Sequence, residues 1–150
     1  MKAGDLTLET KSGAGCLLFI PENKKFLLLQ RSNFVPMPLT WCLPGGGVEQ
    51  NESPDAAAKR EMFEETGFSI TNPMHLIYTN ETHAPRFRFF TYASFIPRVF
   101  TPKLNWESQN YAWHTIDDLP TPLHWGLNQL FNSERAAKKL KKLVDEQILR

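Results

Sequence analysis

The chain has 150 residues, of which 41% are hydrophobic and eleven are phenylalanine, enough to bury the core of one globular domain. Its formal net charge is +1 at pH 7, so no global field favours nucleic acid or an anionic membrane surface. No apolar run has the length of a membrane span, and none follows the N-terminal lysine as in a secretory signal, so we expect a cytoplasmic protein.

The first third of the chain predicts short strands joined by loops. Continuous apolar runs at 14–20 and 25–30 flank a turn and predict a β-hairpin buried on both faces. The segment 32–40 contains two prolines and predicts an irregular loop. Residues 41–43 predict a short strand that leads into a glycine-rich turn at 44–47.

A helix is predicted to begin after Ser53, which suits an N-cap and is followed by a proline, and to end at Gly67, which suits a left-handed C-cap. We expect Ala57 and Ala58 on its acidic side, where small side chains would let a ligand approach. Phe63 falls on the opposite side and is expected to anchor the helix to the core.

The second half predicts three more strands, a single helical turn and an amphipathic C-terminal helix. In chain order these lie at 74–81, 87–95, 111–116, 117–120 and 133–148, with a turn at 84–85 between the first two strands. Four lysines between 138 and 142 could contact RNA, although a solvated helix face is the preferred interpretation. Cys16 and Cys42 are not spaced as a metal pair and are expected to be free thiols, with a disulfide between them as the alternative.

Three carboxylates follow the glycine-rich turn on the predicted helix: Glu61, Glu64 and Glu65. Positions i, i+3 and i+4 share one helix face, so the three acids converge and repel one another. Oxygen-only clusters of this kind suit hard divalent cations such as Mg²⁺ or Mn²⁺. The pattern therefore predicts a metal site on this helix.

The spacing around these acids resembles the Nudix box over residues 46–68. The matching residues are Gly46, Glu52, Arg60, Glu61, Met62, Glu64, Glu65, Gly67 and Phe68. The resemblance implies an α/β protein with the Nudix fold, in which a mixed β-sheet lies between helices, and a single domain over 1–150. It also implies Mg²⁺-dependent hydrolysis, with Mn²⁺ as an alternative, of a nucleoside diphosphate linked to another group.

The roles of the box residues follow from this resemblance. Glu61 and Glu65, one helical turn apart, are the first choice as direct metal ligands. Glu64 is either a third ligand or the base that deprotonates water. Glu52 and Arg60 are expected to pair structurally, orienting the turn and the helix.

Four further site residues come from the same resemblance. In the family, the residue before the first box glycine gives a carbonyl to the metal, and here that residue is Gly45. Gly46 would let backbone groups approach the substrate phosphate, because it has no Cβ. Arg31 takes the place of a basic residue that contacts phosphate, and a guanidinium suits that task. Glu107 is a candidate for a further metal-binding or basic glutamate.

Aromatic and histidine residues outside the box are weaker candidates, because such residues more often lie in the core or on the surface. Those that could stack on a nucleobase or border the site are Phe34, Trp41, Tyr92, Trp125, His83 and His124.

The substrate stays open between a nucleoside triphosphate and a nucleotide sugar, because the flanking signatures of other subfamilies do not match. One alternative is removal of pyrophosphate from RNA 5′ ends, although the near-neutral charge makes nucleic acid an unlikely partner. Another is a non-catalytic nucleotide-binding module. A homodimer is possible, but no interface is visible in the sequence.

Overall fold

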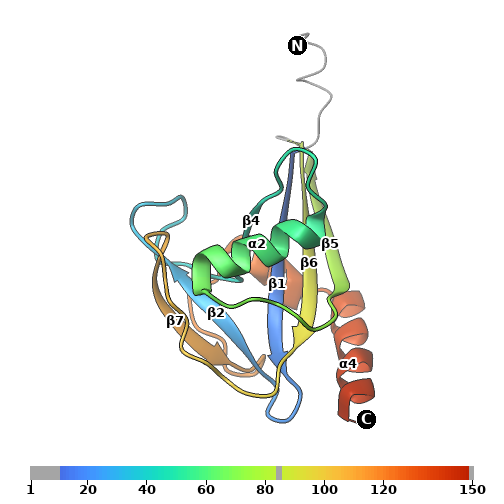
Figure 1. Cartoon of the computed structure of the whole chain (residues 1–150). Helices are drawn as coiled ribbons and strands as arrows, with labels where there is room; N and C mark the ends of the chain where they lie inside the picture. The colour runs from blue at the N-terminus through green and yellow to red at the C-terminus, as the bar shows by residue number, and fades with distance from the viewer. Residues whose placement is uncertain (1–10, 84–85, 149–150) are drawn as a thin grey trace.

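The computed structural model describes residues 11–83 and 86–148. Within them are seven strands and three helices, arranged in space as shown in Figure 1. In chain order they are β1 (Lys11–Ile20), β2 (Lys25–Arg31), β3 (Trp41–Cys42), β4 (Gly45–Gly47), α2 (Pro54–Thr66), β5 (His75–His83), β6 (Arg86–Phe95), β7 (Ser108–His114), α3 (Trp125–Phe131) and α4 (Glu134–Ile148).

The strands form one mixed sheet in the order β3-β2-β1-β6-β5, with β4 also paired to β1 and β7 to β2. The pairing of β1 with β6 is parallel and the other strand pairs are antiparallel. Helix α2 crosses one face of the sheet, and α3 and α4 cover the other (Figure 1). The predicted α/β class, with a mixed sheet between helices, is therefore confirmed.

Strands β1 and β2 are buried on both faces, which explains their continuous apolar sequences. Alternate residues of β1 enter different core clusters: Cys16 and Leu18 pack under α2, whereas Leu17 and Phe19 pack under α3 and α4. The sheet thus supports helices on both sides, and both helix layers are fixed to the same central strands.

The β1–β2 hairpin pairs only beside its turn, at Phe19 with Phe26 and Ile20 with Lys25. Farther along, β4 takes the place next to β1, and β3 pairs with β2. The segment 44–47, which the sequence predicts as a turn, is therefore largely a strand. This pairing brings the three glycines of β4 into the sheet directly beside α2.

Both predicted caps of α2 are present. The Ser53 side chain accepts a hydrogen bond from the backbone N–H of Ala56, and Gly67 has the left-handed φ of 77°. The predicted orientation of the helix is wrong. Ala57 and Ala58 do share the side of the carboxylates, but that side faces the sheet, and both alanines are fully buried. Phe63, expected in the core, is 56% exposed.

The physical reason for this orientation is packing distance. Two alanines allow α2 to lie close to the sheet, and Met62 fills the core beside them. The acidic side chains of the same helix side therefore reach the backbone of the sheet itself.

Differences elsewhere are small. Strand β7 begins at Ser108, three residues earlier than predicted, and in place of the predicted helical turn at 117–120 there is a turn at 115–118, closed by a hydrogen bond from the Asp118 N–H to the Thr115 carbonyl. Helix α3 is absent from the sequence-based prediction, because its seven residues show no clear period and His124 is an unusual N-cap. The predicted turn at 84–85 lies outside the described residues.

The amphipathic C-terminal helix is confirmed as α4, and the lysines between 138 and 142 are exposed on it. Cys16 and Cys42 are free. No helix in the described ranges has the length and apolar character needed to cross a membrane.

Candidate active site

Two carboxylates of α2 touch the backbone of β4. The Gly45 N–H donates a hydrogen bond of 2.7 Å to Glu65 Oε2. At Gly46, a Cβ would lie only 2.5 Å from Glu61 Cδ. A side chain at this position would therefore displace the Glu61 carboxyl group, so Gly46 leaves that group room beside β4.

Burial and mutual repulsion disfavour charge on these acids. Glu65 is only 6% exposed, and burial, reinforced by the charges of Glu61 and Glu107, raises its pKa to about 9. The Gly45 hydrogen bond and the charge of Arg31 oppose this rise. Burial also raises the pKa of Glu61. Of these two acids, Glu65 is the one whose charge is opposed more strongly by its surroundings.

Arg60 is the main cation of this cluster. Its guanidinium contacts Glu52 through two hydrogen bonds of 2.9 and 3.0 Å, and Nη1 lies 3.0 Å from Glu61 and 3.2 Å from Glu64. Nη2 also donates to the Gly47 carbonyl at 2.8 Å. The hydrogen bond with Glu52 is the largest cause that raises the pKa of Arg60. Arg60 therefore ties α2 to both β4 and the loop before the helix.

Glu64 and Glu107 lie at the edge of the cluster. The Glu64 side chain is 49% exposed, and its backbone carbonyl accepts a hydrogen bond from Asn105. The Glu107 carbonyl accepts a hydrogen bond of 2.8 Å from the Ser32 N–H, which holds its loop against the end of β2. The charge of Glu107 acts on Glu61 and Glu65, so the structure brings all four predicted acids into one region.

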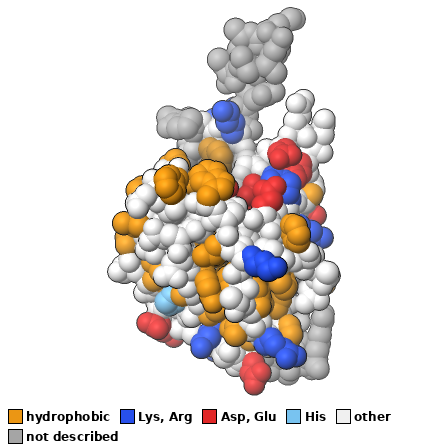
Figure 2. Space-filling model, turned by 60° about the vertical axis from the view of Figure 1, so that its left-hand side comes forward, with side chains coloured by type: hydrophobic (Ala, Val, Ile, Leu, Met, Phe, Trp, Pro, Cys, Tyr) orange, Lys and Arg blue, Asp and Glu red, His pale blue; other side chains and the backbone are white. Residues whose placement is uncertain are grey.

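The donor chemistry fits a hard divalent cation, because the available groups are carboxylates and backbone carbonyls. In the described part of the chain, however, no three His, Cys, Asp or Glu side chains are already grouped as a ligand set. The carboxyl groups of Glu61 and Glu64 instead turn to Arg60. Figure 2 shows this kind of arrangement on the surface, where acidic side chains surround a basic one.

A cavity of about 730 Å³ adjoins β4, within the size range of small-molecule sites. Its wall includes all three glycines of β4 and Arg31, whose Nε donates to the Pro36 carbonyl at 2.7 Å. Cys42 also lines the cavity, but burial raises the pKa of its thiol to about 11. At neutral pH this thiol is protonated and is no nucleophile.

The predicted aromatic and histidine candidates separate in the structure. Trp125 and His124 line the cavity. Trp41 belongs to the core under α3, and Tyr92 packs against the cluster under α2. Phe34 is 81% exposed, and neither it nor the exposed His83 is part of the wall.

Other wall residues were missed by the sequence analysis. Phe87, Phe89 and Thr91 project from β6 on the same face, and Asn80 joins them from the neighbouring β5. The alternation of residues 87, 89 and 91 is a period-2 signal that marks one strand face. The sequence does not show which face borders a cavity.

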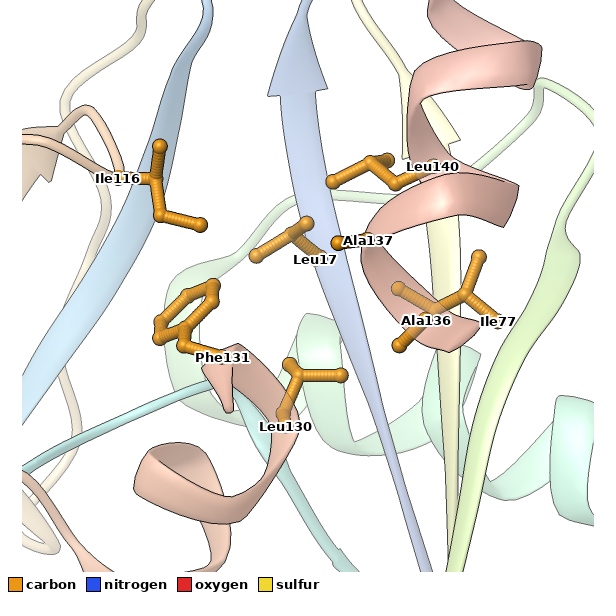
Figure 3. A pocket seen from close by; sticks show the side chains of 8 residues that line it. All are labelled: Leu17, Ile77, Ile116, Leu130, Phe131, Ala136, Ala137 and Leu140. Carbon is orange, nitrogen blue, oxygen red and sulfur yellow. The ribbon is translucent and has the colours of Figure 1, made fainter. Parts of the chain in front are cut away.

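A second hollow is too small for a substrate. It lies between α3, α4 and the sheet and is lined by apolar side chains, including Leu17, Phe131 and Leu140 (Figure 3). Its volume of about 20 Å³ holds roughly one water molecule. The cavity beside β4 is therefore the better candidate for a substrate site.

Comparisons with known proteins identify the family of the chain. The family model of the NUDIX domain matches residues 9–133. Human diphosphoinositol polyphosphate phosphohydrolase 3-alpha is 29% identical over 113 residues, which cover 72% of this chain and 66% of the human protein. The mouse protein of that name is 46% identical over 57 residues, 38% of this chain and 34% of the mouse protein. These relatives are thus matched over less than two thirds of their own length.

Among solved structures, the MutT protein from Methanosarcina mazei Go1 superposes with a TM-score of 0.72 and 26% identity, covering 89% of this chain and 99% of that chain. The chain therefore belongs to the NUDIX family.

Proposed function

We propose that this protein hydrolyses a nucleoside diphosphate linked to another group, with a nucleoside triphosphate or a nucleotide sugar as the leading substrate. The observation that carries the proposal is the position of β4, whose glycines have Glu61 and Glu65 on one side and the cavity on the other. The phosphohydrolases among the relatives support the same class of bond.

Mg²⁺, or Mn²⁺ in its place, would neutralise phosphate oxygens and lower the pKa of a bound water. In this proposal Glu61, Glu65 and the Gly45 carbonyl hold the cation, and Glu107 adds negative charge beside them. Glu64 has the most exposed carboxylate of the helix group. It serves as a third ligand or accepts the proton of the attacking water.

The remaining residues position the substrate and the acids. The Arg31 guanidinium donates from Nε to the Pro36 carbonyl, which holds it in the cavity wall, and in this proposal its terminal nitrogens bind a phosphate. Gly46 leaves the backbone open to the pyrophosphate, because no Cβ separates them. Arg60 and Glu52 orient the helix against β4, and their hydrogen bonds of 2.9 and 3.0 Å support this role.

The test is hydrolysis of a substrate panel with Mg²⁺ in ¹⁸O-labelled water, followed by mass spectrometry of the products. The panel contains nucleoside triphosphates, nucleotide sugars, dinucleotides and inositol pyrophosphates. We expect Glu64→Gln to lower the rate by about 10²- to 10⁴-fold, as for loss of a general base. Glu22→Gln, which changes an exposed acid in the β1–β2 turn, is the matched control.

Turnover of at least one compound, lost in Glu64→Gln and kept in Glu22→Gln, supports the proposal. If no compound reacts, or if both variants behave as the wild type, it fails. Nucleotide binding without turnover would instead identify a binding module. The near-neutral net charge of +1 does not favour the RNA alternative, and one of the exposed lysines of α4, Lys141, pairs with Asp145 at 3.0 Å.

A further inference from the structure

Glu107 is the last residue of the loop between β6 and β7, and its backbone is hydrogen-bonded on both sides. Its N–H donates to Asn105 Oδ1 at 3.0 Å, and its carbonyl accepts a bond of 2.8 Å from the Ser32 N–H. The peptide groups that flank Glu107 are therefore fixed, and the position of its carboxyl group then depends on its side-chain torsions alone.

Asn105 connects this loop to the acidic helix. Its Nδ2 donates to the Glu64 carbonyl at 3.1 Å, while its Oδ1 accepts from the Glu107 N–H. The Glu64 carbonyl belongs to the last turn of α2, where carbonyls have no partner within the helix. One planar amide thus joins the backbone of Glu107 to the turn that carries the three box acids.

Ser32 holds the same loop from the other side. It directly follows β2 and is only 5% exposed. Its Oγ donates to the Trp106 carbonyl at 2.9 Å, next to the bond between its N–H and the Glu107 carbonyl. The same Oγ accepts a bond of 3.3 Å from the Phe34 N–H, so the hydroxyl is itself fixed. The loop is therefore held between the end of a core strand and the end of a helix.

This arrangement keeps Glu107 close to like charges. The charge of Glu107 contributes to the raised pKa values of Glu61 and Glu65, so the three carboxylates repel one another. Repulsion alone would move a loosely held loop away from α2, and the bonds of Asn105 and Ser32 oppose that movement. A divalent cation, which prefers several carboxylate oxygens, is the ligand that gains from holding them together.

We propose that Asn105 and Ser32 are positioning residues of the cation site: they hold Glu107 beside Glu61 and Glu65, so that its carboxylate contributes to the affinity for Mg²⁺ or Mn²⁺. This inference rests on the proposed function, because it concerns the cation that the reaction needs. A purely structural role for Asn105, as a partner for the open end of α2, would stabilise the helix without acting through the Glu107 carboxylate.

The experiment measures Mn²⁺ binding to the whole chain without substrate, from the electron paramagnetic resonance signal of the free ion. Asn105→Ala should weaken binding roughly 2- to 10-fold, the range of one hydrogen bond. Glu107→Gln should weaken it at least as much. Because Asn105 acts through Glu107, adding Asn105→Ala to Glu107→Gln should cause no further loss beyond about twofold. Additive losses, or wild-type affinity in either single variant, would overturn the inference.

Asn23→Ala is the matched control. Asn23 Oδ1 accepts from the Lys25 N–H at 3.0 Å, the same two-residue pattern as in Asn105, but in the exposed turn between β1 and β2. Its replacement should leave Mn²⁺ affinity unchanged, and a loss equal to that of Asn105→Ala contradicts the assignment. Thermal unfolding of each variant establishes that it is folded.

Two further variants separate the contacts. Asn105→Ser keeps an acceptor for the Glu107 N–H but is too short to reach the Glu64 carbonyl, so it should bind Mn²⁺ as weakly as Asn105→Ala. Wild-type affinity in this variant would show that the link to α2 has no role. Ser32→Ala keeps the backbone bond to Glu107 and should have a smaller effect than Asn105→Ala, whereas a larger one contradicts the proposed order.

The two proposals fail in different ways. If Glu61→Gln abolishes Mn²⁺ binding but Asn105→Ala and Glu107→Gln leave it unchanged, only the positioning role is refuted. If Mn²⁺ binding depends on Asn105 as expected but no compound of the substrate panel is hydrolysed, only the enzymatic function is refuted. A wild-type chain that binds no Mn²⁺ refutes both.

Discussion

The two sides of β4 differ in their chemistry and in the parts of the chain that build them. On the side of α2, carboxylates and one guanidinium come mostly from residues 45–65, and hydrogen bonds connect them directly to the strand. On the other side, an apolar wall is assembled from the loop after β2, from β5 and β6, and from α3. Groups suited to the reaction are thus supplied locally, whereas groups suited to recognition depend on the whole fold.

The largest effect is expected where α2 is anchored to the sheet. Met62 is fully buried, so Met62→Ala should lower the free energy of unfolding by about 2–5 kcal/mol. Phe63→Ala, the control on the exposed side of the same helix, should cost about 0.5 kcal/mol or less. Urea unfolding measures both. A larger loss in Phe63→Ala than in Met62→Ala would mean that the helix faces the sheet with its other side, and equal losses would contradict the described orientation.

The contact between α2 and β4 can be tested at two neighbouring glycines. In Gly46→Ala the new Cβ meets the Glu61 carboxyl group, and we expect a loss of about 1–3 kcal/mol of stability. In Gly47→Ala nothing lies within 4 Å of the new Cβ, so stability should change by about 0.5 kcal/mol or less. Thermal unfolding compares the two variants. A tolerated Gly46→Ala would show that the acidic side is not tightly packed.

A smaller loss is expected when the charge of Arg60 is kept but its shape is changed. Arg60→Lys retains one cation but cannot reproduce the hydrogen bonds to Glu52, Glu61 and Gly47, so it should cost about 1–2 kcal/mol. Arg88→Lys alters an exposed pair with Glu81 and should cost less than about 0.5 kcal/mol. Chemical denaturation at low salt measures the loss of stability in each variant. Equal losses would mean that the Arg60 cluster stabilises the protein no more than an exposed ion pair does.

On the apolar side, the expected effect is a change in pH dependence. Burial, together with the charge of Arg31, lowers the pKa of His124 below its ordinary 6.5. The neutral ring is therefore favoured in the folded state. Its contribution to the free energy of unfolding is present above pH 6.5 and is lost as the pH falls through the lower pKa of the folded state. His124→Asn should keep the helix cap to within about 0.5 kcal/mol and flatten this decline. Urea unfolding at several pH values gives the slope of the free energy of unfolding against pH. Identical slopes for the wild type and His124→Asn would contradict the prediction.

The acidic side could be predicted largely from sequence, because its information is short-range. The spacing of Glu61, Glu64 and Glu65 needs only helix geometry, and Ser53 and Gly67 mark the helix ends. The predicted direction in which the helix faces was wrong, because two alanines on its acidic side are compatible both with close packing against the sheet and with open access for a ligand. Only contact with the sheet distinguishes these meanings.

The apolar side could not be predicted in the same way. Asn80, Phe87 and Trp125 lie far apart in the chain, and each residue alone has the sequence signal of an ordinary strand or loop position. Their proximity follows from the β5–β6 pairing and from the packing of α3, which itself has too few residues for a clear helical period. Tertiary contacts, rather than local pattern, decide this part of the site.

Gly45 belongs to both sides of the strand, because its N–H donates to Glu65 while the residue itself lines the cavity. A change in the charge of that carboxyl group alters the hydrogen bond and, with it, the peptide that a ligand meets. If these carboxylates hold a cation, as proposed above, thermodynamic linkage makes the influence mutual: an occupant of the cavity would change the affinity for the cation by the same factor as the cation changes the affinity for the occupant. In that case the three-residue strand β4, which has no side chains, would couple cation binding on one of its sides to ligand binding on the other.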